Sequence, residues 1–429
     1  MYKLFKYLLL ILFLVLASFV GLFILSIESE PQFSARSGQQ VDQAESVKKL
    51  MKQLSDSVKN RETQQNITIT ESQLNSLVGF AQRAHKPLQG QVEITSQSAL
   101  ILASYALPQN PLGNYINIEI LMLSGVGIQF EHVKVGPFLI PGNLALRTLV
   151  TIANWYTGSD IATQFVQQVE NVTMYPQKMI LAVRPLDQFL KDLNEVKQGV
   201  GGSSDEELRL RTAYYLKNLS DLDIGNKTRP QSLAKFMGPL FNWAKQRSTY
   251  ETAAQENKAA ILALAIYAGH HRFANFVGDV QPEVGKVALP RVKPMLKYRG
   301  DLNQHFLFSA AIKILSEQGL SIAIGEFKEL MDRGKGGSGY SFVDLAADIA
   351  GVEFARAATD PTTAWFVQQK LANNYSEGLF FPQIKGLPEG LRKEKFTKQF
   401  GEVDSPKYVK MLDEIQRRIA NLPIHSEHQ

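Results

Sequence analysis

Acidic and histidine side chains gather between residues 299 and 351, and they are the residue types best suited to chemistry. Asp301 and His305 are four positions apart, so they share one face if this segment is helical. Asp344 and Asp348 repeat that spacing further along the chain. Carboxylate and imidazole groups commonly transfer protons in catalysis and bind divalent cations. The window therefore predicts a site for proton transfer or for a metal ion.

Three more acidic residues lie between these two pairs and extend the candidate site. Glu326, Glu329 and Asp332 follow at steps of three, which lets them progress around one side of a helix. We expect His305, Glu329 and Asp348 to be candidate catalytic residues, because crowded acids hold different protonation states. His305, Glu326 and Glu329 could instead bind a divalent metal ion. The candidate binding residues are Asp301, Glu326, Asp332, Ser338, Asp344 and His271.

None of these spacings is diagnostic of a particular kind of site. The sequence has no H-E-x-x-H pair for zinc, and residues 334–340 lack the pattern of a phosphate-binding loop. No G-x-S-x-G pattern supports a serine nucleophile. Lys328 and Asp332 are also four positions apart, so a structural network of surface ion pairs is an alternative. Whether the protein is an enzyme, and which cofactor it uses, stay open.

The order of the polar residues carries a resemblance to a known family. The chain reads Asp301-x-x-x-His305-Phe306, Ser309-Ala310, Gly325-x-x-Lys328-Glu329-Leu330-x-Asp332, Gly337-Ser338-Gly339-x-Ser341 and Asp344-Leu345-x-x-Asp348-x-x-Gly351. Over residues 299–355 this order resembles the YfiM-type family of predicted periplasmic lipoproteins and, more distantly, the VanZ-like membrane proteins. The resemblance implies a location in the cell envelope and supplies no reaction. The chain departs from the family because it has no cysteine to carry a lipid.

The cluster needs helices that bring distant positions together. Apolar residues recur at helical spacing over residues 301–317, 321–332 and 341–358. Ser341 is an N-cap candidate for the third of these segments. Short connections favour antiparallel packing of such helices, so the polar groups would meet at one end of a bundle. Similar patterns before and after this window predict a mostly α-helical domain over residues 205–429.

The preceding part of the chain predicts an α+β domain with an antiparallel sheet over residues 65–198. Alternating polar and apolar residues, as at 115–120, are typical of strands. Thr70-Glu71-Ser72-Gln73 has the form of a capping box and predicts the start of a helix. We also expect a helix over residues 143–169 and a strand over residues 172–183.

This domain has a resemblance of its own. The segments Ile67-Thr68-Ile69-Thr70-Glu71-Ser72-Gln73-Leu74-Asn75, Val133-Lys134-Val135-Gly136 and Ile140-Pro141 are the residues that carry it. Over residues 65–185 they resemble envelope domains of the tubular lipid-binding kind. That resemblance implies a curved sheet around a helix, with an apolar groove that binds lipid. The alternative is an ordinary α+β domain with a filled core.

The N-terminal segment predicts a membrane anchor. Residues 8–27 contain no charged side chain, and about 20 such residues in a helix span the hydrocarbon core of a bilayer. A cleavable signal peptide is the rival interpretation, but Leu25-Ser26-Ile27-Glu28 offers no good cleavage pattern. We therefore expect a transmembrane helix with a short flank over residues 1–28, and a tether with an amphipathic helix over residues 29–64.

Charges on the two flanks predict the orientation of this anchor. Lys3 and Lys6 precede the uncharged run, and Glu28 and Glu30 follow it. Basic flanks stay in the cytoplasm, so the N-terminus should be cytoplasmic and the body periplasmic, in a single-pass protein of the inner membrane. The lipid bilayer would be the partner of residues 8–27.

Composition supports a largely globular body and excludes several classes. The 429 residues are 45% hydrophobic and 20% charged, which is ordinary for folded domains. The absence of cysteine excludes disulfides, zinc fingers and a cysteine nucleophile. A net charge of +5 on a chain of this length, without a recognition motif, predicts no nucleic-acid partner. Neither protein partners nor an oligomeric state can be predicted.

Three functions are consistent with these features. The first is envelope maintenance by an anchored protein that binds a lipid or a cell-wall component. The second is an acid/base or metal-assisted hydrolase. It would use His305, Glu326, Glu329, Asp344 and Asp348. The third is a structural scaffold protein.

Overall fold

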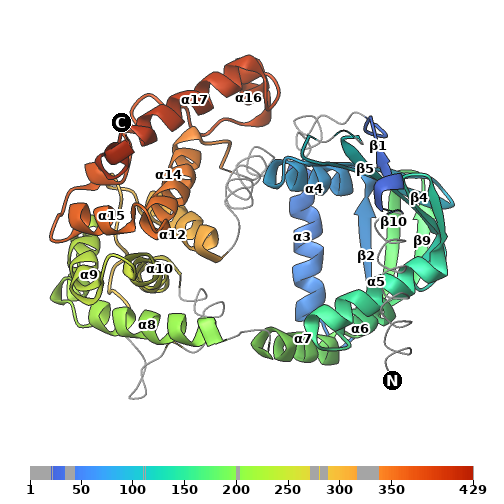
Figure 1. The fold of residues 1–429 in the computed structure, drawn as a ribbon, viewed down its shortest axis with the longest axis horizontal. Helices are drawn as coiled ribbons and strands as arrows, with labels where there is room; N and C mark the ends of the chain where they lie inside the picture. Colours follow the sequence, from blue (N-terminus) through green and yellow to red (C-terminus); the bar gives the residue numbers. More distant parts are fainter. Residues whose placement is uncertain are drawn as a thin grey trace, which may run out of the picture. The chain divides into compact units, whose positions relative to one another are not determined.

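The computed structural model divides into two compact units, Met1–Lys197 and Gln198–Gln429. It describes residues 21, 23–33, 44–109, 111, 113–199, 203–270, 280, 288–315 and 338–428. The fold is mixed α+β, with antiparallel sheets and many helices (Figure 1). Each unit has its own core and is described by itself.

The first unit contains both sheets and the helices that cover them. Its strands are β1 (Ile27–Glu28), β2 (Gln65–Thr70), β3 (Leu88–Ile94), β4 (Ser98–Ala106), β5 (Tyr115–Leu123), β6 (Gly125–Val126), β7 (Gln129–Val135), β8 (Phe138–Pro141), β9 (Val169–Tyr175) and β10 (Lys178–Val183). Its helices are α3 (Ala44–Lys59), α4 (Glu71–Ala84), α5 (Gly142–Thr157), α6 (Ile161–Gln168) and α7 (Asp187–Gly199).

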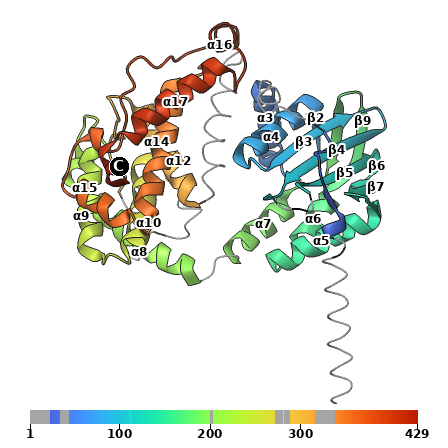
Figure 2. The same cartoon turned by 45° about the horizontal axis from the view of Figure 1, so that its top comes forward.

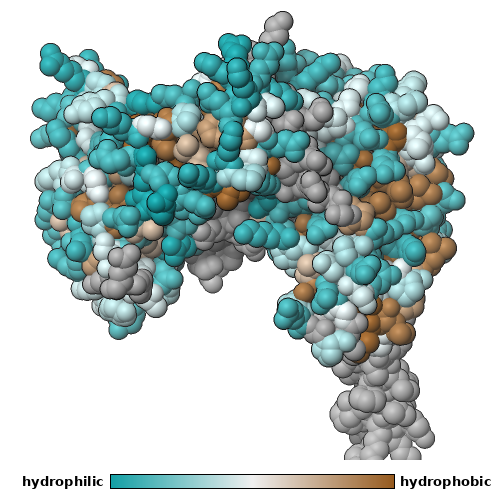
Figure 3. Space-filling model, turned by 90° about the horizontal axis from the view of Figure 1, so that it is seen from above, coloured by the Kyte–Doolittle hydropathy of each residue, from teal (hydrophilic) through white to brown (hydrophobic). Residues whose placement is uncertain are grey.

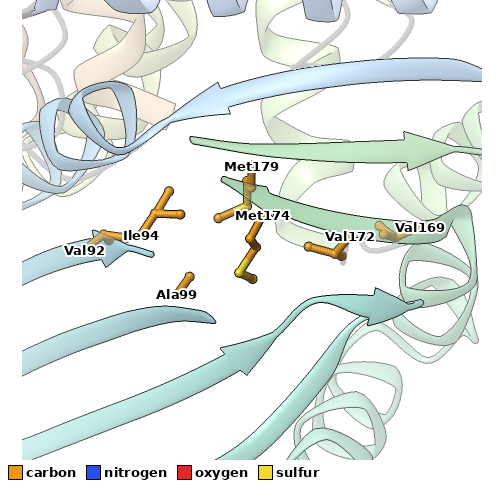
Figure 4. Close-up of a cluster of buried hydrophobic side chains, with 7 residues drawn as sticks. All are labelled: Val92, Ile94, Ala99, Val169, Val172, Met174 and Met179. Atoms are coloured by element: carbon orange, nitrogen blue, oxygen red, sulfur yellow. The ribbon is translucent and has the colours of Figure 1, made fainter. Parts of the chain in front are cut away.

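Every described strand pairing is antiparallel. The larger sheet has the order β3-β4-β5-β7-β8, with β1 also paired to β5, and the smaller has the order β2-β10-β9-β6. Side chains from both sheets meet in one hydrophobic cluster (Figure 4). Its buried members are Val92, Ile94, Ala99, Val169, Val172, Met174 and Met179. These side chains hold the two sheets together, because they remove apolar surface from water.

Helix α4 begins where the sequence predicts it. Thr70 is the N-cap, and its side chain accepts a hydrogen bond from the backbone N–H of Gln73. The Gln73 side chain accepts one in return from the backbone N–H of Thr70, so the capping box is confirmed. The amphipathic helix predicted before it is α3, which buries Val47 and Leu50 and packs against α4 and β2.

Two predictions of long single elements in this unit are wrong. The helix expected over residues 143–169 is divided into α5 and α6 by Gly158, which adopts a left-handed conformation with φ +60°. That conformation ends a helix and costs glycine little. The strand expected over residues 172–183 is a hairpin of β9 and β10, turned at Gln177 with φ +62°.

The segment expected to be a tether begins by binding the sheet. Strand β1 pairs with the start of β5, with Ile27 opposite Ile116. The Asn117 side chain donates to the backbone carbonyl of Glu30, and the backbone N–H of Gln32 donates to the Asn117 side chain at 3.1 Å. The contacts at residues 27–32 therefore fix this part of the chain to the sheet of the first unit.

No helix within the described ranges is both long and apolar enough to cross a membrane. The span predicted over residues 8–27 lies mostly outside those ranges, so it stays a prediction.

The second unit is helical. Its α-helices are α8 (Ser203–Ser220), α9 (Ala234–Arg247), α10 (Ala253–Leu264), α12 (Gly300–Leu315), α14 (Phe342–Thr359), α15 (Ala364–Leu371), α16 (Lys393–Phe400) and α17 (Pro406–Ala420). Shorter turns are η1 (Asp223–Asn226), the π-helix η2 (Ala265–Gly269), η4 (Glu377–Leu379) and η5 (Pro423–His428).

Helices α12 and α14 form the most extensive contact among the described helices of this unit. Gly351 of α14 lies against the backbone of α12, because a Cβ at this position would stand 2.2 Å from the carbonyl oxygen of Phe306. Phe306 itself packs on Phe354, with ring centroids 5.3 Å apart, and on Phe380 and Phe381. A glycine and an aromatic cluster thus set the spacing of the two helices that carry the candidate site.

Candidate functional site

His305 of α12 and Asp348 of α14 form the centre of the described polar cluster. The Nδ1 atom of His305 lies 3.1 Å from each carboxylate oxygen of Asp348. The Ser309 hydroxyl donates to the Oδ1 atom of the same carboxylate at 2.7 Å. The side chains of His305 and Asp348 are only 11% and 5% exposed. A buried carboxylate is therefore held by a hydroxyl and an imidazole from the facing helix.

Helical spacing explains how these groups meet. His305 and Ser309 are four positions apart on α12, so both project toward α14. Asp344 and Asp348 have the same spacing on α14 and face α12. The N-cap of α14 is Ser341, whose side chain accepts from the backbone N–H of Asp344 at 3.0 Å, as the sequence predicts. The cap fixes where α14 begins and hence which face both acids occupy.

The second nitrogen of His305 is directed toward another acid. The Nε2 atom lies 3.8 Å from the Oδ2 atom of Asp344, which is longer than a hydrogen bond. With Nδ1 turned to Asp348, the imidazole therefore lies between two carboxylates from one helix. Such an arrangement fixes the orientation of the ring.

An arginine links this buried cluster to more exposed acids. Arg299 contacts Asp301 and Glu389, each at 2.6 Å, and Asp344 at 3.3 Å. The hydrogen bonds from Arg299 lower the pKa of Asp301, and those acids raise the pKa of Arg299. Polar contacts thus continue from the exposed Glu389 through Arg299 to Asp344, beside His305.

A serine triad does not fit the position of Ser309. In a Ser-His-Asp triad the serine and the carboxylate bind opposite nitrogens of the histidine. Here Ser309 and the Nδ1 atom of His305 both bind Asp348, so the hydroxyl lies on the carboxylate side of the ring. Ser309 is placed to position Asp348.

The structure brings together three of the residues predicted for the site and separates two others. His305, Asp344 and Asp348 converge, whereas Asp301 is exposed and reaches them only through Arg299. Ser338 is exposed and lies three residues before the N-cap Ser341. The candidates outside the described residues are His271, Glu326, Glu329 and Asp332.

The predicted metal site is therefore only partly described, because Glu326 and Glu329 lie outside the described residues. Within the ranges that the structure covers, no group of three or more acidic or histidine side chains is arranged to hold a metal ion. The metal interpretation stays a prediction.

Three members of the network were not expected. Ser309 carried a local signal, since it lies four positions after His305. Arg299 and Glu389 are 90 residues apart in sequence, and no local pattern predicts that they pair. Such a contact depends on tertiary packing.

A cavity of about 540 Å³ lies on the other side of α14. Glu353, Arg356 and Phe366 are among its lining residues, and none of the candidate site residues is. His425 also lines it, and burial lowers the pKa of that histidine. The described cavity is thus separate from the His305 cluster.

Comparison with family models, with curated proteins and with solved structures finds no match for this chain. The two family resemblances therefore stay predictions, and the geometry of the site has to support any function.

Proposed function

We propose that the protein is a membrane-anchored hydrolase of the cell envelope in which His305 transfers protons. The observation that supports this is the buried contact between His305 and Asp348, in which Nδ1 lies 3.1 Å from both carboxylate oxygens. A carboxylate in this position fixes the ring orientation and stabilises the imidazolium that forms during proton transfer. The same contact is expected of a general acid or base.

The position of Asp344 suggests how water takes part. When Nδ1 donates its proton to Asp348, the Nε2 atom of a neutral ring is an acceptor, as is the Asp344 carboxylate 3.8 Å away. A water molecule can donate one hydrogen to each of these acceptors. His305 would then take a proton from that water while the water oxygen attacks the carbon of the scissile bond. As that carbon–oxygen bond breaks, the imidazolium of His305 would give the proton to the departing oxygen. Asp344 would orient the water, and Asp348 would orient His305.

The envelope location rests on the N-terminal sequence. Residues 8–27 are uncharged and long enough to span a bilayer, with basic residues before them and acidic residues after them. We propose that they anchor the chain in the inner membrane, with the body in the periplasm. A substrate with an ester or a glycosidic bond, from a lipid or the cell wall, fits this location.

The test is hydrolysis by the full chain, purified in detergent, of a panel of chromogenic carboxyl esters, phosphodiesters and glycosides. Loss of a general base commonly costs about 10²–10⁴-fold in rate, so His305→Ala should lower turnover by that amount. Asp348→Asn should lower kcat with little change in KM. The asparagine has the shape of the aspartate, but it lacks the negative charge that stabilises the imidazolium during proton transfer. If His305→Ala hydrolyses every accepted substrate as fast as the natural chain, the proposal is wrong.

His132→Ala is the matched control for this test. His132 contacts Glu119 at 3.2 Å in the first unit, so the variant also removes a histidine–carboxylate pair. It should leave turnover unchanged. Equal losses in His132→Ala and His305→Ala would point to a general effect of losing a histidine rather than to the site.

A second candidate function is lipid binding by the first unit. Its cluster of buried residues is surrounded by apolar side chains that are only partly buried, among them Ile101, Met122 and Ile128. Partly covered apolar side chains of two facing sheets can bind an acyl chain. Mass spectrometry of lipids that remain with the full chain, after exchange into a detergent without phospholipid, tests this candidate. Absence of a stoichiometric lipid would contradict it.

A further inference from the structure

Helix α5 exposes an unusual number of large apolar side chains. Five of its sixteen residues are hydrophobic or aromatic and more than half exposed. They are Leu144 (56%), Leu149 (52%), Ile152 (56%), Trp155 (83%) and Tyr156 (80%). Figure 3 shows hydrophobic side chains gathered on the surface of the first unit. Single exposed hydrophobic residues are ordinary, but five large exposed apolar side chains on one helix indicate a binding surface.

These side chains form one face. At about 3.6 residues per turn they lie within an arc of roughly 140° around the helix. The opposite side carries Leu146, Val150 and Thr157, which are half-buried, and the helix packs on β7 and β8. We call the five exposed residues the α5 face. One side of the helix thus packs against its own unit, and the other side is apolar and exposed.

The charge and the aromatic residues of this helix fit a bilayer surface. Residues 136–159 contain a single charged side chain, Arg147, which is exposed and basic. Anionic lipid headgroups can pair with an arginine, and the absence of acidic residues avoids repulsion. Trp155 and Tyr156 stand together at the C-terminal end of the α5 face. Tryptophan and tyrosine are enriched where a membrane meets water.

The first described residues of the chain lie close to the turn that precedes α5. The exposed residues Phe23, Ile24 and Leu25 lie near the end of the uncharged run at 8–27. The backbone of Ser26 lies against Gly136, where a Cβ would stand 2.6 Å from the Ser26 carbonyl oxygen. Gly136 turns β7 into β8, and β8 leads directly into α5. Figure 2 shows the first described residues, in blue, on the side of the unit where α5 lies.

We infer that the α5 face lies in the headgroup region of the bilayer that residues 8–27 enter. The inference rests on the proposed anchor and adds a second, peripheral membrane contact to it. Because β1 is paired with β5, no free linker separates the end of the uncharged run from the unit. The first unit is thus held against the membrane at two places, and its exposed apolar helix is removed from water.

The absence of cysteine allows a direct test. Thr148 is exposed between the apolar residues of the α5 face, so Thr148→Cys leaves all five in place. The full chain carrying this variant is labelled with a fluorophore that is sensitive to polarity. It is then reconstituted into vesicles of phosphatidylethanolamine and phosphatidylglycerol. Lys49→Cys, on the exposed side of α3, is the matched control.

The expected result is that the label at position 148 emits at shorter wavelength and is quenched by nitroxides on the lipid acyl chains. Quenching by aqueous iodide should be about fivefold weaker than at position 49, since an interfacial helix is buried several ångströms deep. Resistance of the chain to extraction from the vesicles at alkaline pH reports on the anchor separately. If such chains show equal iodide quenching at the two positions, the α5 contact is wrong and the anchor is unaffected.

Two further results would each contradict the inference in a different way. A chain that alkaline treatment removes from the vesicles would overturn the anchor, and with it the inference. A label at position 148 that is protected from iodide but not quenched by lipid nitroxides would show that protein covers the α5 face. If that protection disappears on dilution of the chain in the vesicles, a second copy is the occupant, and the bilayer assignment is wrong.

Discussion

At the scale of single residues, the Asp348 carboxylate is the most consequential group of the described site. It accepts hydrogen bonds from His305 and Ser309 while almost fully buried. Burying a carboxylate is unfavourable unless such partners compensate for lost hydration. Asp348 is thus important for the folded state whether or not His305 transfers protons.

We predict that Asp348→Ala destabilises the second unit more than Ser309→Ala does. The first change leaves two buried donors without their shared acceptor and should lower the free energy of unfolding by about 3 kcal/mol. The second removes one hydrogen bond and should cost about 1 kcal/mol. Urea unfolding of the full chain measures both. Because the two residues share an interaction, the double variant should lose less than the sum; additive losses would contradict the shared network.

His425 should make the second unit sensitive to acid. Burial lowers its pKa, and its Nε2 atom is buried with no hydrogen-bond partner among the described residues. In the unfolded chain it binds a proton near its ordinary pKa of about 6.5, but the folded state resists protonation until lower pH. The unfolded state therefore binds more protons, and the free energy of unfolding should fall as pH drops below about 6.5.

His425→Leu tests this pH dependence. The variant should lose less stability than the natural chain between about pH 7.5 and about pH 5, because no buried imidazole remains to be protonated. Calorimetry of the full chain follows the change through the melting temperature. An equal drop in both proteins would show that other groups cause the acid sensitivity.

At the scale of elements, local sequence patterns predict starts of helices better than their packing. Both predicted caps, at Thr70 and at Ser341, are confirmed, because a cap depends on residues within one turn. The break at Gly158 was missed because an apolar pattern continues on both sides of it. The spacing of four residues also predicted correctly that Asp344 and Asp348 share one face of a helix. The ion pair of Arg299 with Glu389 joins distant parts of the sequence, so only the folded structure shows it.

The close approach of α12 and α14 should depend on Gly351. A methyl group at this position would collide with the backbone of α12, which has no flexible end that could move aside. Gly351→Ala should therefore cost about 1–3 kcal/mol and lengthen the contact between His305 and Asp348. Gly300→Ala is the control, because nothing lies within 4 Å of the new methyl group. It should leave stability unchanged or raise it, through its higher helix propensity.

Thermal unfolding of the full chain compares these two glycine variants. A Gly351→Ala chain that melts at the same temperature as Gly300→Ala would contradict the proposed spacing of the helices.

At the scale of the whole molecule, composition predicts less than the distribution of residues along the chain. The average hydrophobic content hides one uncharged run at the N-terminus and a second stretch, residues 136–159, with one charge. The N-terminal run can be recognised in the sequence from its length alone. The apolar surface of residues 136–159 can be recognised only in the structure, which shows that α5 packs on β7 and leaves large apolar side chains exposed. From the sequence alone, a helix that is apolar on both sides could equally be buried.

The orientation of the proposed anchor can be tested with a fused reporter. A reporter enzyme that is active only in the periplasm, fused after Gln429, should be active, because Lys3 and Lys6 favour a cytoplasmic N-terminus. Changing both lysines to glutamate should lower reporter activity by about tenfold, since no basic residue then precedes the span. The same change at the exposed Lys48 and Lys49 of α3 alters the net charge equally. Those two lysines lie beyond the region where flanking charge sets orientation, so that control should keep full activity.

An inactive reporter on the natural chain, with the fusion intact in the membrane fraction, would reverse the orientation. The proposed hydrolase site and the α5 contact would then face the cytoplasm.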